Sequence, residues 1–92
     1  MKSLTAQEIA THLVALPEWQ IEKGVLTRTF AFKDFVAALA FVNKVGECAE
    51  EAGHHPDIDI RYNKVRLGLV THDAGGLTVK DFNLAAILDS VV

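Results

Sequence analysis

Apolar and polar residues alternate with two different periods along this chain. Between residues 34 and 52 the apolar positions recur every three or four residues, which predicts one long amphipathic helix. Gly53 follows this stretch and predicts a left-handed end to the helix. Elsewhere the apolar positions recur every second residue, which is typical of strands with one buried face. Four stretches have this alternation: residues 19–22, 25–32, 58–62 and 65–69.

The four alternating stretches pair into two predicted hairpins. Lys23-Gly24 separates the first two, and its glycine suits the positive φ that a two-residue turn requires. Asn63-Lys64 separates the other two and is interpreted as a second two-residue turn. With that turn, Tyr62 lies opposite Val65, and the apolar positions of both strands share one face.

Two capping boxes predict the starts of two further helices. In Thr5-Ala6-Gln7-Glu8 and in Thr78-Val79-Lys80-Asp81, the threonine oxygen can accept from the backbone of the acidic residue, which reaches back in turn. We expect the first helix to run to about Leu16, because Pro17 cannot continue it. We expect the second to run from about Val79 to Ser90.

The order of these elements is helix, hairpin, long helix, hairpin, helix. This order predicts an α+β fold, in which a four-stranded antiparallel sheet from two hairpins has three helices packed on one face. A chain of 92 residues can bury a core of its own, so we expect residues 1–92 to form a single domain.

Composition and charge narrow the class of protein. The net charge is −3 and the nine lysines and arginines are scattered, which argues against nucleic acid as a partner. No apolar run approaches the roughly 18 residues of a membrane span, and the polar start is unlike a signal peptide. The single cysteine, Cys48, suits a reducing compartment, so we expect a cytoplasmic protein. A hydrophobic content of 50% hints at apolar surface buried between subunits.

Three of the four histidines flank the second predicted hairpin. When its register is extended outward, His55 lies opposite His72, and directly opposed strand residues have Cβ atoms about 4.5 to 5.5 Å apart. His54 follows the C-terminus of the long helix, whose dipole favours a protonated imidazole. We therefore expect the three histidines to form one site.

Three interpretations fit such a cluster. A metal site needs three or four ligands with defined geometry, but neighbouring residues on a strand point apart. The histidines could also be polar loop residues without a role. Proton transfer is the better match, because histidine both gives and takes a proton near neutral pH. No serine or cysteine nucleophile accompanies the cluster, and no phosphate-binding glycine loop follows a strand.

A set of motifs with fixed spacing runs continuously from Glu50 to Asp81. It consists of Glu50, His54-His55-Pro56, Tyr62-Asn63-Lys64-Val65, Leu69-Val70-Thr71-His72-Asp73, Gly76-Leu77-Thr78 and Asp81. These residues and their spacing resemble the pterin-4a-carbinolamine dehydratase family, and the similarity is looser over the rest of the chain. Ile58-Asp59 stands where animal members carry an aromatic pair, which is a departure in the expected pocket wall.

The resemblance implies dehydration of 4a-hydroxytetrahydropterin to quinonoid dihydropterin, without metal or organic cofactor, in recycling of the pterin of aromatic amino acid hydroxylases such as phenylalanine hydroxylase. It also implies homodimers or homotetramers. The expected catalytic residues are His54, His55 and His72, and the expected substrate-binding or orienting residues are Glu50, Pro56 and Asp81.

Two further expectations follow from the resemblance. A protonated His55 or His72 would donate to the departing hydroxyl while His54 accepts a proton. Asp81 would either cap its helix alone or also orient a histidine. The alternative function is a non-catalytic dimerisation scaffold, like the transcriptional coactivators among the animal members.

Overall fold

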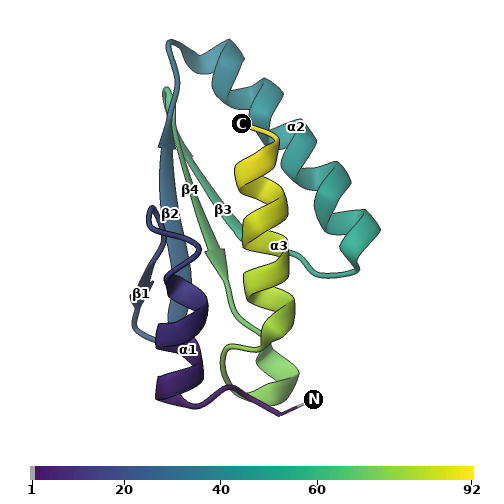
Figure 1. Ribbon diagram of the computed structural model, residues 1–92. Coiled ribbons are helices and arrows are strands. Elements are labelled where there is room, and N and C mark those ends of the chain that lie inside the picture. Colours follow the sequence, from purple (N-terminus) through teal and green to yellow (C-terminus); the bar gives the residue numbers. More distant parts are fainter. Residues whose placement is uncertain (1) are drawn as a thin grey trace.

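The computed structural model describes residues 2–92, so Met1 of the expected 1–92 domain lies outside the described residues. Three α-helices, four strands and one short 3₁₀ helix follow one another along this part of the chain (Figure 1). In chain order they are α1 (Ala6–Leu13), β1 (Gln20–Glu22), β2 (Val25–Ala31), α2 (Phe35–Ala52), β3 (Asp57–Arg61), β4 (Lys64–Leu69), η1 (His72–Ala74) and α3 (Val79–Ser90).

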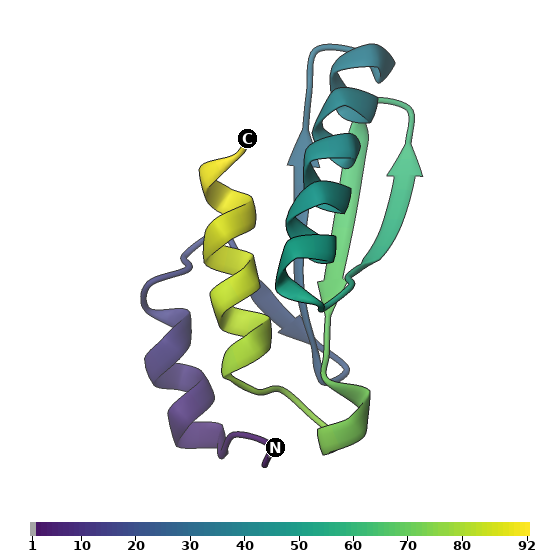
Figure 2. The same cartoon turned by 90° about the vertical axis from the view of Figure 1, so that its right-hand side faces the viewer.

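The four strands form one antiparallel sheet in the order β1-β2-β4-β3. Each predicted hairpin forms, and the two hairpins join where β2 pairs with β4. The three helices lie on one side of this sheet and leave the other side open (Figures 1 and 2). The predicted α+β fold is confirmed.

The ends of the helices follow the local sequence signals. Both capping boxes form, at Thr5 with Glu8 and at Thr78 with Asp81. Helix α3 has the predicted bounds, but α1 ends at Leu13, three residues before the prediction. Single turns follow it, in which the amide of Leu16 donates to the carbonyl of Leu13, and the Leu16 side chain is buried in the core.

The register of the second hairpin differs from the prediction by two residues. Its turn is Tyr62-Asn63, not Asn63-Lys64, because Arg61 pairs with Lys64. Tyr62 adopts a left-handed φ of 52°, and the Asn63 side-chain amide donates to the carbonyl of Phe32 at 2.8 Å. The predicted pairing of Tyr62 with Val65 is therefore wrong, while the apolar residues keep their face because the shift is even.

The core lies between the helices and the inner face of the sheet. Leu26, Val65 and Leu67 on the strands and Leu88 on α3 have no exposed surface. No helix formed by residues 2–92 is both long and apolar enough to cross a membrane.

A polar clamp fixes the far end of α3 against the sheet. One carboxylate oxygen of Asp89 accepts from the indole of Trp19 at 2.8 Å and from the guanidinium of Arg28 at 2.7 Å. The Arg28 guanidinium also lies 4.1 Å from the centre of the Phe30 ring. This clamp holds α3, whose first turn reaches the histidines at its other end.

Candidate active site

The end of α2 delivers His54 to the site. Gly53 takes a left-handed conformation with φ 64°, and its amide donates to the carbonyl of Glu50. The amide of His54 donates to the carbonyl of Ala49 at 3.1 Å, which completes a Schellman motif. The direction in which the chain leaves α2, and with it the place of His54, is thus fixed by backbone hydrogen bonds.

His54 contacts a buried carboxylate on α3. Its Nε2 lies 2.6 Å from Oδ1 of Asp81, and the side chain of Asp81 has no exposed surface, while that of His54 is 13% exposed. Asp81 is also the acidic residue of the capping box, since its Oδ2 accepts from the amide of Thr78. It therefore caps the helix and contacts a histidine as well.

His55 contacts a different carboxylate at the surface. Its Nε2 lies 2.5 Å from Oε2 of Glu50, in the last turn of α2. Both side chains are largely exposed, at 62% and 79%. The two adjacent histidines are therefore paired with two separate carboxylates, one buried and one in solvent.

His72 does not lie on a strand. It begins the short helix η1, which the sequence analysis missed, and Thr71 bridges to Gly76 across this turn. With the observed register, the position opposite residue 55 is residue 70, so the predicted cross-strand pairing of His55 with His72 is wrong.

The three histidines nevertheless line one depression of about 300 Å³. Its wall also includes residues that the sequence analysis did not single out, above all Lys80 of α3 and Thr71, which directly precedes His72. Pro56 is half-buried just before β3 and lies outside the lining residues. The full lining is Gly53, His54, His55, Val70, Thr71, His72, Asp73 and Lys80.

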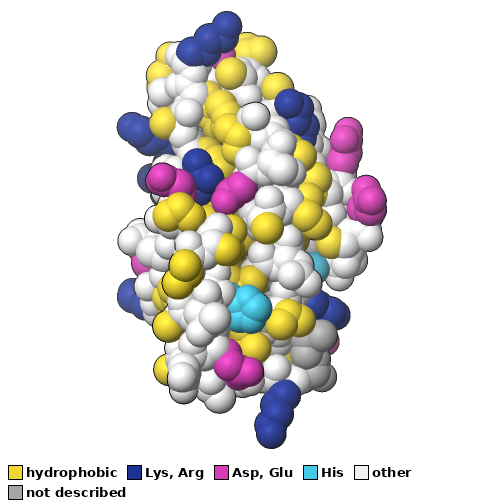
Figure 3. All heavy atoms as spheres, viewed as in Figure 1, with side chains coloured by type: hydrophobic (Ala, Val, Ile, Leu, Met, Phe, Trp, Pro, Cys, Tyr) yellow, Lys and Arg dark blue, Asp and Glu magenta, His cyan; other side chains and the backbone are white. Residues whose placement is uncertain are grey.

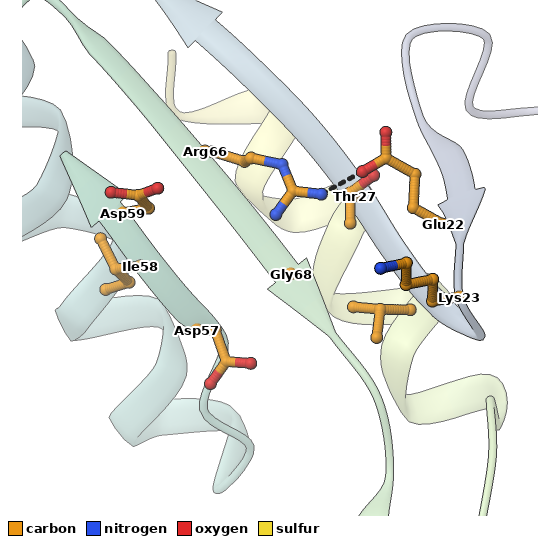
Figure 4. A pocket seen from close by; sticks show the side chains of 9 residues that line it. Glu22, Lys23, Thr27, Asp57, Ile58, Asp59, Arg66 and Gly68 are labelled. Atoms are coloured by element: carbon orange, nitrogen blue, oxygen red, sulfur yellow. Dashed lines mark hydrogen bonds and ion pairs between the residues drawn. The ribbon is translucent and has the colours of Figure 1, made fainter. Parts of the chain in front are cut away.

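A larger depression, of about 710 Å³, lies elsewhere, on the open face of the sheet (Figure 4). Arg66 of β4 reaches across β2 and forms an ion pair with Glu22 of β1. Asp57 and Asp59 of β3 stand on the same face. The imidazoles line the smaller depression, so the candidate acid–base site is there.

Among residues 2–92, no three or more histidine, cysteine, aspartate or glutamate side chains are grouped closely enough to hold a metal ion. Every buried polar side-chain atom described has a hydrogen-bond partner.

Fold and pocket together define a small α+β protein with a histidine and carboxylate cluster suited to proton transfer. Residues 2–91 match the family model described as pterin 4 alpha carbinolamine dehydratase. The chain belongs to the pterin-4a-carbinolamine dehydratase family.

Curated relatives match over the whole chain. A protein of Acidobacterium capsulatum named "Putative pterin-4-alpha-carbinolamine dehydratase" is 59% identical over 92 residues, covering 100% of both chains. A protein of the same name from Chloroflexus aurantiacus is 56% identical and covers 100% of this chain and 99% of its own.

Two solved structures have a similar fold. The crystal structure of a transcriptional coactivator/pterin dehydratase from Brucella melitensis has a TM-score of 0.93 at 35% identity, covering 98% of each chain. A pterin dehydratase-like protein described as a RuBisCO assembly factor in the alpha-carboxysome has a TM-score of 0.65 at 26% identity, covering 79% of this chain and 84% of its own.

Proposed function

We propose that this protein catalyses the dehydration of 4a-hydroxytetrahydropterin to quinonoid dihydropterin and water. Family membership supports the substrate class. The observation that carries the proposal is the shared depression, in which His54, His55 and His72 meet although the chain separates the first two from the third. A cluster of imidazoles beside carboxylates can supply both an acid and a base near neutral pH.

The reaction requires one proton to be given and one to be removed. The 4a-hydroxyl leaves as water once an acid donates a proton to it, and a base removes the proton from N5 as the C4a–N5 double bond forms. Each such transfer by a positioned side chain typically contributes about 10² to 10⁴-fold to the rate. No net proton or electron is consumed, so histidines alone can complete the cycle.

The surroundings of each histidine support a division of these roles. The contact with the buried Asp81 suits His54 as the base, because a carboxylate stabilises the imidazolium that forms when the ring accepts a proton. His55 beside Glu50, or His72 on η1, then serves as the acid that protonates the hydroxyl. Pro56, just before β3, is assigned to orienting the substrate.

The proposal extends to the setting of the reaction. Residues 1–92 act as one cytoplasmic domain that uses no metal or organic cofactor, and the reaction recycles the pterin of an aromatic amino acid hydroxylase, with phenylalanine hydroxylase as the expected link. The chain assembles into a homodimer or homotetramer. Hydrophobic side chains are exposed on the helical side of the molecule (Figure 3), which supports assembly. Among them, Val36 of α2 is 74% exposed and Ile87 of α3 is 46% exposed.

The test is an assay of turnover. Stopped-flow absorbance that follows the loss of 4a-hydroxytetrahydropterin should show acceleration over the spontaneous reaction. The alternative function, a non-catalytic dimerisation scaffold, predicts no acceleration at all. A scaffold has no need of three histidines around one depression, which is why the enzyme is proposed first.

A further inference from the structure

Asp81 has more contacts than capping and one histidine require. Its Oδ2 accepts from the hydroxyl of Thr71 at 2.8 Å and from the amide of Thr78 at 2.9 Å. The two threonine hydroxyl oxygens lie 2.8 Å apart. Thr71 is 9% exposed and Thr78 and Asp81 are 0% exposed, so the network is largely shielded from solvent.

The hydrogen atoms of the network can be assigned by counting donors and acceptors. Each hydroxyl has one hydrogen. If Thr71 donates to Asp81, the hydroxyl of Thr78 is free to donate to Thr71, and every hydrogen has an acceptor. If Asp81 were protonated towards Thr71, Thr71 would donate to Thr78, and the Thr78 hydrogen would be left without an acceptor in a buried site, which is costly. The arrangement therefore makes Oδ2 of Asp81 an unprotonated acceptor.

The state of Asp81 determines the tautomer of His54. With Oδ2 accepting from both threonines, a hydrogen shared between Oδ1 and Nε2 of His54 belongs to the nitrogen, because imidazole is a stronger base than a carboxylate. Nε2 of His54 therefore donates to Oδ1 at 2.6 Å. In the neutral ring Nδ1 is then the unprotonated nitrogen, and it alone can take a proton from a substrate. Thr71 also directly precedes His72. Its hydroxyl therefore links the segment that carries His72 to Asp81, the carboxylate that contacts His54.

We propose that Thr71 is a positioning residue of this site. Its hydroxyl, oriented by Thr78, holds the carboxylate of Asp81 as the acceptor of the hydrogen on Nε2 of His54. The proposal rests on the proposed dehydratase function for its effect on rate. Its structural part concerns the free protein and can be tested without turnover.

The kinetic test compares Thr71→Val, Thr71→Ser and Thr27→Val. Valine keeps the shape of threonine and removes the hydroxyl, and misplacing a reacting group can lower the rate up to about 100-fold. We expect kcat of Thr71→Val to fall roughly 10- to 100-fold with little change in KM, and Thr71→Ser to restore most of the rate. Thr27 is the matched control, because it is a 1% exposed threonine whose hydroxyl donates to the carbonyl of Gln20 on the neighbouring strand.

An equal loss of rate in Thr71→Ser and Thr71→Val would overturn the proposal, and so would an equal loss of rate in Thr27→Val.

The second measurement is the imidazole ¹H–¹⁵N spectrum of the wild-type protein at a pH where its histidines are neutral. We expect His54 with hydrogen on Nε2, and a hydrogen on Nδ1 instead contradicts the proposal even if Thr71→Val fails to fold. If the spectrum is as expected but no variant or wild-type protein accelerates dehydration, the proposed function has failed and the hydrogen-bond assignment has not.

Discussion

His54 and His55 are neighbours in the chain, yet their surroundings differ sharply. The imidazole of His54 lies against a carboxylate with 0% exposure, whereas Glu50 beside His55 is 79% exposed. An ion pair in solvent contributes little to folding, but a buried carboxylate that loses a donor is left uncompensated. The two contacts therefore have different consequences for stability.

This difference predicts the effect of truncating each histidine. His54→Ala removes the donor of Asp81 Oδ1 and should lower the free energy of unfolding by about 1–3 kcal/mol. His55→Ala is the matched control at an exposed site and should change it by no more than about 0.5 kcal/mol. Urea denaturation followed by circular dichroism measures both values, and equal losses would show that the Asp81 contact is not what distinguishes the two residues.

The sequence predicted which residues form the candidate site better than it predicted their partners. His54 was expected from its place after the long helix, and Glu50 and Asp81 were expected from the family resemblance. That His54 contacts Asp81 depends on how the start of α3 packs beside the end of α2, across 27 residues of chain. The hydroxyl of Thr71 was overlooked because a threonine before a histidine in an expected strand gives no local signal.

At the scale of elements, motifs of a few adjacent residues predicted turns and helix starts more reliably than the alternation of apolar residues predicted strand register. The Lys23-Gly24 turn joins β1 to β2 as predicted, since Glu22 pairs with Val25. The turn of the second hairpin was misplaced because alternation fixes only which face a residue occupies. In the observed register Asn63 contacts Phe32, which directly follows β2 of the other hairpin, and the pattern of β3 and β4 does not reveal this contact.

The left-handed end of α2 leads to a second prediction. Gly53→Ala places a Cβ at φ 64° and should lower the free energy of unfolding by about 1 kcal/mol. Gly46→Ala is the control in the middle of the same helix, where an added Cβ meets no atom within 4 Å. It should raise stability by about 0.5–1 kcal/mol. Changes of the same sign in both variants would argue against the assigned role of Gly53.

The first capping box leads to a prediction about pH. The backbone amide of Thr5, and then its hydroxyl, hydrogen-bond to Glu8 and lower the pKa of its carboxyl. A group whose pKa is lower in the folded protein stabilises it above the usual glutamate range, and this contribution disappears as the pH falls through the folded-state pKa. The difference in melting temperature between wild type and Glu8→Ala should therefore shrink on acidification. Gln7→Ala, which removes no titrating group, should show a constant difference, and a constant difference for Glu8→Ala would contradict the interpretation.

At the scale of the whole molecule, two helix ends and one short turn meet beyond the sheet. The end of α2 brings His54 and His55, η1 brings His72, and the start of α3 brings Asp81 beneath them. The order of elements predicted the sheet and the side on which the helices pack. The depression itself could not be predicted, because η1 turns away from the strand on which the sequence had placed His72.

The most direct test of this account is the rate at which purified protein consumes freshly generated 4a-hydroxytetrahydropterin in a stopped-flow instrument. We predict that the rate rises in proportion to protein concentration above the spontaneous rate, and that His72→Ala lowers the catalysed rate by about 10² to 10⁴-fold. Because His72 is exposed, this variant should keep the wild-type circular dichroism. A wild-type rate equal to that of buffer alone would contradict the account.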